Sequence, residues 1–71
     1  MPLIQMYFAK GTLNEEQKVE LSKKITDLIV NEAKQPQHYT WVIINEIPGE
    51  NWMVDRLTIP ELKAKLQSGK Q

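Results

Sequence analysis

The chain has 71 residues, no cysteine, one histidine, 41% hydrophobic residues and a formal net charge of zero. This length predicts a single domain over residues 1–71. Because cysteine is absent and histidine occurs once, a disulfide framework and a zinc site of Cys/His type are excluded, and no metal is expected. So short a chain buries only about 60% of the surface that its unfolded form exposes. Association is the remaining way to stabilise it, so we expect a homo-oligomer.

Charge and hydropathy argue against two classes of partner. A neutral chain with a single arginine does not suit nucleic acid, since phosphate neutralisation needs clustered cations. Lys63, Lys65 and Lys70 make the C-terminal quarter mildly basic, but acidic side chains among them indicate a solvated face. No apolar run approaches the roughly 20 residues that a bilayer requires, and no signal-peptide pattern opens the chain. We therefore expect a cytoplasmic protein without a nucleic-acid or membrane partner.

The first two predicted elements are a strand and a helix. Residues 3–9 form a short apolar run that Gly11 ends, which is typical of a buried strand. From Asn14 the chain is dense in helix formers and has no Gly or Pro until Pro36, which predicts an amphipathic helix of about five turns. Asn14 and Gln17 have the spacing of a capping box. The apolar side chains predicted to share one helix face are Leu21, Ile25, Leu28, Ile29 and Ala33.

A second strand is predicted over residues 39–47, which are β-branched and aromatic and are followed by Pro48 and Gly49. Four consecutive apolar side chains from Trp41 indicate that both sheet faces are covered, as in a parallel sheet. The fold class is therefore α/β, with a single βαβ protomer. One helix covers one face, so a second copy must cover the other. A shorter helix is predicted over residues 60–67, with Pro60 at its first position.

Pro2 is the first candidate for chemistry. Methionine before proline is normally removed, which would leave Pro2 as an N-terminal secondary amine at the start of a buried strand. An α-amino group has an unperturbed pKa of about 7.7–8.0, and burial beside apolar groups lowers that pKa. Such an amine is a general base near neutral pH. While Met1 is attached, the same nitrogen is an amide without a basic lone pair.

The whole chain resembles the tautomerase superfamily, and within it the 4-oxalocrotonate tautomerase group. The resemblance rests on the opening residues 1–5, the helix start at residues 13–18, the second strand at residues 42–47 and the aromatic Trp52. It implies a βαβ protomer that pairs with a second one into a four-stranded sheet with the helices on one face. It also implies either a dimer or a trimer of such dimers.

The resemblance implies an isomerase without metal or organic cofactor. Pro2 would be the base that moves a proton between the hydroxyl of an enol and a carbon of an unsaturated or aryl 2-oxo acid. Trp52 matches an aromatic residue that walls the active site. Its alternative role is a hydrophobic interface side chain, and both roles can hold at once.

The sequence departs from the family pattern where arginines bind substrate. Thr12 or Leu13 occupies the place of one arginine, and Trp41 occupies the place of the other. A diacid held by two arginines is therefore not the expected substrate. The charge of a carboxylate or enolate would have to be met by Lys10, Arg56 or backbone N–H groups. Trp41 is a further candidate substrate-binding residue.

Residues 48–52 followed by a helical tail resemble the small dimeric branch of the family, so a dimer is the first expectation and a hexamer the second. Two alternatives to a tautomerase stay open. One is a hydratase or dehalogenase relative, in which a protonated Pro2 would act as an acid. The other is a weakly active or inactive oligomeric protein that binds a ligand on the same scaffold.

Overall fold

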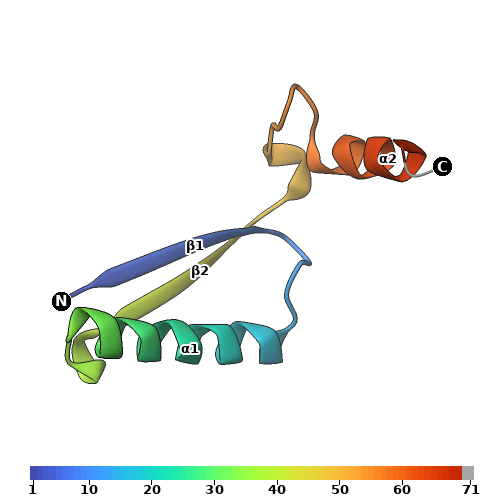
Figure 1. The fold of residues 1–71 in the computed structure, drawn as a ribbon. Helices are drawn as coiled ribbons and strands as arrows, with labels where there is room; N and C mark the ends of the chain where they lie inside the picture. Colours follow the sequence, from blue (N-terminus) through green and yellow to red (C-terminus); the bar gives the residue numbers. More distant parts are fainter. Residues whose placement is uncertain (70–71) are drawn as a thin grey trace.

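The computed structural model describes residues 1–69, and it contains a two-stranded parallel sheet (Figure 1). Strand β1 (Leu3–Ala9) and strand β2 (Trp41–Ile47) pair in a register that places Leu3 beside Trp41 and Ala9 beside Ile47. Helix α1 (Glu15–Ala33) connects them and covers one face of the sheet. The predicted βαβ unit and the predicted bounds of the first strand are confirmed.

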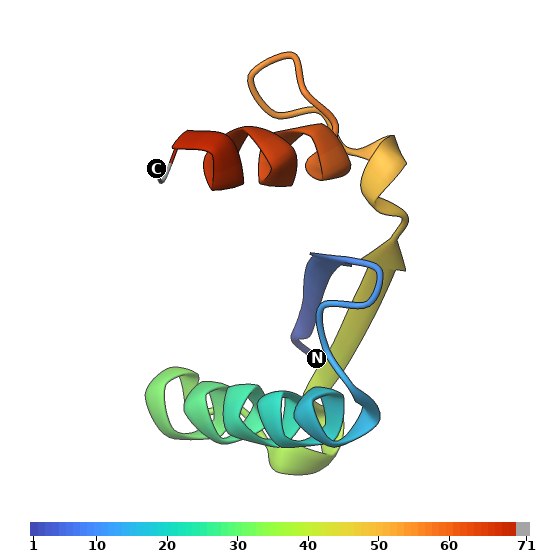
Figure 2. The ribbon, with the colours of Figure 1, turned by 90° about the vertical axis from the view of Figure 1, so that its right-hand side faces the viewer.

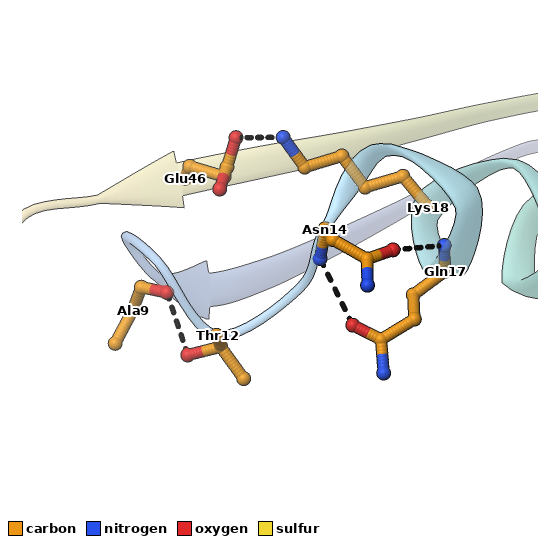
Figure 3. Close-up of polar contacts among 6 residues, drawn as sticks. All are labelled: Ala9, Thr12, Asn14, Gln17, Lys18 and Glu46. Atoms are coloured by element: carbon orange, nitrogen blue, oxygen red, sulfur yellow. Dashed lines mark hydrogen bonds and ion pairs between the residues drawn. The ribbon is translucent and has the colours of Figure 1, made fainter.

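Local side-chain contacts fix the start of α1. The Asn14 side chain accepts a hydrogen bond from the Gln17 N–H at 2.8 Å, and the Gln17 side chain accepts one from the Asn14 N–H at 2.9 Å (Figure 3). This reciprocal pair is the predicted capping box. Glu15 and Glu16 add negative charge to the first turn, where the helix dipole favours it. The helix ends at Lys34, whose φ of 56° is left-handed.

The face of the sheet beneath α1 is apolar. Ile4, Met6 and Phe8 alternate with exposed residues along β1, and all three are half-buried. Among the predicted helix positions Leu21, Ile25 and Ile29 are half-buried. The predictions for Leu28 and Ala33 were wrong, because Leu28 is 53% exposed and Ala33, the last residue of the helix, is exposed as well. The half-buried stripe of α1 instead includes the following four residues: Lys18, Ser22, Thr26 and Val30.

The opposite face of the sheet is apolar and open. Leu3 and Tyr7 of β1 are 52% and 58% exposed, and Trp41 and Ile43 of β2 are 53% and 42% exposed. We call these four side chains the open face. A solvated antiparallel sheet normally places polar residues on its wet side, and these residues are not polar. The open face is therefore the part of the protomer that most needs a covering partner.

Two short 3₁₀ turns flank the second strand. The turn η1 (Gln37–Tyr39) precedes it, so Tyr39 belongs to a turn rather than to the predicted strand. The physical reason is that the Tyr39 N–H bonds to the Pro36 carbonyl at 3.2 Å, which curls the chain before it extends. The turn η2 (Gly49–Asn51) follows Ile47 and leads away from the sheet.

The last described segment contains a tight hairpin and helix α2 (Ile59–Gly69). Val54 and Leu57 form an isolated antiparallel bridge with two hydrogen bonds of 2.8 and 2.9 Å. The helix begins one residue before the predicted Pro60, after Thr58, whose N–H donates to the Glu61 carboxylate at 2.9 Å. Figures 1 and 2 show α2 beyond the C-terminal end of β2 and on the side of the sheet opposite to α1. The expectation of a helical tail without a hairpin is thus only half right, since the segment contains both.

The protomer is extended for its length. Its radius of gyration is 16.0 Å, whereas a compact domain of this size has one of about 11 Å. Its accessible surface is 5815 Å², against about 4,600 Å² for a compact monomer of the same mass. In the described part of the chain, no hydrophobic side chain is fully buried. These values fit a subunit whose core is completed by association. No helix among the described residues is both long and apolar enough to cross a membrane.

Candidate functional site

Pro2 and Trp41 lie together at the N-terminal end of the sheet. The Trp41 N–H donates to the Pro2 carbonyl at 3.0 Å, which extends the pairing of β1 with β2 by one step. A cavity of about 230 Å³ is lined here by Met1, Pro2, Leu3 and Trp41. Of the described residues, none that lines this cavity has a charged side chain. The surroundings are therefore those that lower the pKa of an amine by disfavouring its charged form.

Lys10 and Trp52 lie together at the other end of the sheet. The Lys10 N–H donates to the Ile47 carbonyl at 2.8 Å, and the Trp52 indole Nε1–H donates to the same carbonyl at 3.1 Å. Trp52 is half-buried at the end of η2, so its ring is held in place by a backbone acceptor as well as by packing. Lys10 itself is exposed. This end of the sheet thus combines a fixed aromatic ring with a cation.

Arg56 lies apart from both pairs, in the turn of the C-terminal hairpin. Asp55 and Arg56 have φ values of 54° and 65°, so the two residues between Val54 and Leu57 are both left-handed, as in a type I′ turn. Arg56 is exposed. Its side chain lines neither the cavity at Pro2 nor the groove described below.

The two ends of the sheet are far apart within one chain. Each strand has seven residues, so the ends are separated by about 20 Å at 3.3 Å per residue. The fold therefore brings Pro2 to Trp41 and Lys10 to Trp52, but it does not bring these two pairs to each other within one protomer.

Glu46, near the C-terminal end of β2, is paired with Lys18 of α1 across the covered face of the sheet (Figure 3). The hydrogen bond from Lys18 lowers the pKa of Glu46 below its ordinary value of 4.5, partial burial opposes this effect, and the positive charges of Lys18 and Lys10 reinforce the lowering. Both side chains are about one-third exposed, at 35% and 28%. The ion pair joins the helix to the sheet, and the Glu46 carboxylate therefore already has a partner.

The side chain of Thr12 is also engaged in a hydrogen bond. Its hydroxyl donates to the Ala9 carbonyl at 2.7 Å and its N–H donates to the same oxygen at 3.1 Å (Figure 3). The side chain that stands in one of the expected arginine positions therefore closes the turn after β1. Within the described residues, no group of three or more carboxylate or imidazole side chains is placed to hold a metal ion.

A groove of about 280 Å³ lies between the end of β1, η2 and the start of α2. Lys10 and Lys63 line it together with Glu50. Gly49 makes this arrangement possible, because a Cβ there would lie 3.2 Å from the Cβ of Ile59. Lys63 was not among the residues that the sequence predicted for the site. Its spacing of four residues from Ile59 is the signal that places it over the same groove.

A hollow of about 560 Å³ lies elsewhere, between α1 and the edge of β2. Two of the polar side chains that line it have partners. Lys18 pairs with Glu46, and the Thr26 hydroxyl donates to the Ser22 carbonyl at 2.8 Å. The hollow carries no combination of base and aromatic wall, so the ends of the sheet are the better candidates for chemistry.

The comparisons with known proteins agree with this fold. Residues 2–58 match the family described as "Tautomerase enzyme", so the chain belongs to this family. It is 34% identical over 62 residues to the 2-hydroxymuconate tautomerase of Comamonas testosteroni, which covers 87% of this chain and 97% of that protein. The expected membership of the 4-oxalocrotonate tautomerase group is confirmed.

Two solved structures show the same architecture. TomN, a 4-oxalocrotonate tautomerase homologue in the tomaymycin biosynthetic pathway, superposes with a TM-score of 0.84 at 25% identity, covering 89% of this chain and 95% of TomN. A heterohexamer 4-oxalocrotonate tautomerase from Chloroflexus aurantiacus superposes with a TM-score of 0.81 at 27% identity, covering 87% and 98%. Tautomerases are thus the proteins that this chain resembles in sequence and in fold.

Proposed function

We propose that this protein is a cofactor-independent keto–enol tautomerase that acts on a small enol or 2-oxo acid, with Pro2 as the general base. The observation that carries the proposal is the position of Pro2 at the start of β1, in an apolar cavity with Trp41. The family match, which begins at Pro2, supports it. So does the 34% identity to a protein named a 2-hydroxymuconate tautomerase.

The chemistry requires a free Pro2 nitrogen, so removal of Met1 is the activating step. The nitrogen lone pair then accepts the hydroxyl proton of the enol, and the O–H bonding pair becomes the second bond of the ketone. The electron pair of the carbon–carbon double bond takes a proton from the Pro2 ammonium at carbon. One proton leaves oxygen and one arrives at carbon, and the base is regenerated.

The apolar cavity supports the role of Pro2 as a base. Leu3 and Trp41 offer no opposite charge, so they disfavour the ammonium form of the free Pro2 nitrogen. An amine that is partly unprotonated at neutral pH can take the hydroxyl proton and then release it to carbon.

The complete site, in this proposal, forms between two copies. A two-fold axis perpendicular to the sheet pairs the free edge of β1 with β1 of the second copy in the antiparallel sense. Such pairing gives a four-stranded sheet with both α1 helices on one face. It also brings the C-terminal end of one β1 to the N-terminal end of the other. Pro2 and Trp41 of one subunit then lie beside Lys10 and Trp52 of the partner subunit.

Each of the remaining residues has an assigned role in the paired site. Trp52 of the partner subunit closes the cavity over Pro2 and packs on the substrate, and Trp41 forms the wall on the near side. Lys10 of the partner subunit meets the negative charge of the carboxylate or enolate. Arg56 lies at the tip of an exposed turn, so we assign it the outer rim, where it attracts anions to the entrance.

The test is ketonisation of the enol of phenylpyruvate by protein whose intact mass shows that it starts at Pro2. We expect a rate above buffer that rises with the loss of one proton from a group with a pKa at or below neutral. The same protein retaining Met1 is the control and should be inactive. A rate equal to buffer for the processed protein would contradict the proposal and favour a ligand-binding protein. The lack of arginines in the two expected positions is consistent with that alternative.

A further inference from the structure

The groove beside α2 has a net positive charge that the described chain does not neutralise. Lys10 and Lys63 line it against a single carboxylate, that of Glu50. Within the described residues, salt bridges engage Lys18, Lys23 and Lys65, but neither Lys10 nor Lys63 is among them. Glu46, whose pKa the charge of Lys10 helps to lower, is already paired with Lys18.

The rest of the groove is apolar. Ala9 comes from the end of β1, and Ile59 and Pro60 come from the first turn of α2. A groove of about 280 Å³ that is lined by two cations and by apolar side chains fits a small amphiphilic anion. One net positive charge matches one carboxylate rather than two.

Lys63 lies in α2, which is outside the part of the chain that matches the family, residues 2–58. Helix α2 packs against η2, and the close approach of Ile59 to Gly49 fixes its start. In Figure 2, α2 extends from the side of β2 toward the side of β1, on the face of the sheet opposite to α1. A subunit paired through β1 therefore lies under α2.

We propose that Lys63, together with Lys10, binds the substrate carboxylate in this groove, and that α2 thereby makes the enzyme selective for apolar 2-oxo monocarboxylates. The inference rests on the proposed function, because the groove meets Pro2 only in the two-fold pair. Lys63 supplies the positive charge that an arginine after β1 would otherwise provide. As a point charge without a planar fork, it selects for charge and tolerates variation in the orientation of the acid.

The experiment compares phenylpyruvate with its methyl ester, which has the same aryl and enol groups but no charge. Ketonisation of both enols is measured for the wild type, Lys63→Gln and Lys65→Gln. Lys65 is the matched control, since it lies on the same helix and does not line the groove. We expect Lys63→Gln to lower the acid-to-ester ratio of kcat/KM about tenfold through KM, because a hydrogen bond to a charged group is lost. Lys65→Gln should leave the ratio unchanged.

Equal ratios in the two variants would overturn the proposal. If Lys63→Gln fails to assemble, Lys63→Arg replaces it, and this variant should keep the preference for the acid. If no protein shows ketonisation, the proposed function fails, but calorimetric titration with phenylpyruvate still tests Lys63. Binding weakened about tenfold by Lys63→Gln and unchanged by Lys65→Gln would support the groove alone, and equal binding by both would contradict it.

Discussion

The N-terminal end of the sheet offers a nitrogen in an apolar cavity, whereas the C-terminal end offers cations and a fixed indole ring. Pro2 and Trp41 have no neighbour with a charged side chain among the residues that line their cavity. Lys10, Lys63 and Trp52 lie about 20 Å away at 3.3 Å per residue of strand. Neither end is sufficient for proton transfer on a charged substrate. In the proposed function, the protomer therefore carries two half-sites, which antiparallel pairing of two copies would join.

Association also fits the extended shape of the protomer. The accessible surface exceeds that of a compact monomer by about 1,200 Å², and a standard interface buries about 800 Å² from each partner. The excess is therefore large enough for a stable association. The exposed large hydrophobic side chains include those of the open face and Leu66 of α2.

The largest expected effect comes from placing a charge on the open face. Ile43→Lys would bury an unpaired ammonium if a partner covers this face, so association should weaken at least 100-fold, or about 2.7 kcal/mol. Sedimentation measures the association, and circular dichroism checks that the subunit still folds. The control is Leu28→Lys on the exposed side of α1, which should remain assembled. If both variants associate equally well, the open face is not part of the interface between subunits.

The second effect concerns the nitrogen at the N-terminal end. Pro2→Ala keeps an N-terminal amine but replaces the secondary amine by a primary one and alters its position. We expect kcat/KM for phenylpyruvate enol to fall at least tenfold, or about 1.4 kcal/mol in the barrier. The assembly state should not change. An unaltered rate would remove Pro2 as the base.

The third effect concerns the aromatic ring at the C-terminal end. Trp52→Ala removes the wall over the cavity and the hydrogen bond to the Ile47 carbonyl. The rate should fall about fivefold to tenfold, and association should weaken as well, because the ring has apolar surface to bury. Enzyme kinetics and sedimentation on the same sample separate the two consequences. A change in association alone would assign Trp52 to the interface.

The smallest effect is the pH dependence of stability from Glu46. Its pKa is lowered in the folded chain, so the pair with Lys18 stabilises the fold above pH 4.5 and this contribution is lost as the pH falls through the folded pKa. Glu46→Gln should therefore flatten the fall of Tm below about pH 4.5, measured at fixed protein concentration. Glu32→Gln, on the exposed side of α1, should keep the fall. An unchanged slope in Glu46→Gln would show that the pair is not formed in solution.

The elements with strong local signals could be predicted from the sequence. The apolar run ended by Gly11 has the bounds of β1, and the reciprocal spacing of Asn14 and Gln17 marks the start of α1. The hairpin at residues 54–57 was missed because its two turn residues are Asp and Arg, without the Gly or Asn that a type I′ turn favours. Leu28 was assigned to the wrong face because spacings of three and four residues fit two adjacent stripes on one helix, and only one of them packs on the sheet.

The sequence named most residues of the candidate site, but it predicted neither Lys63 nor the arrangement. Pro2 and Trp52 follow from family resemblance, whereas their separation by the length of the sheet follows only from the parallel pairing of β1 and β2. Lys63 could not be distinguished from its neighbour Lys65 by composition, since both are exposed lysines on a short helix. Only the packing of Ile59 against Gly49 shows which of the two faces the groove.

Subunit mixing tests the shared site most directly. Pro2→Ala and Trp52→Ala proteins are each expected to be impaired, and they are unfolded together, refolded and assayed at a concentration where both assemble. In a mixed pair, one site receives Pro2 from one subunit and Trp52 from the other, so about a quarter of all sites are intact after random mixing. We expect recovery to about a quarter of wild-type activity by this pairing statistic. Activity equal to the mean of the two separate variants would contradict a site built from opposite ends of two copies.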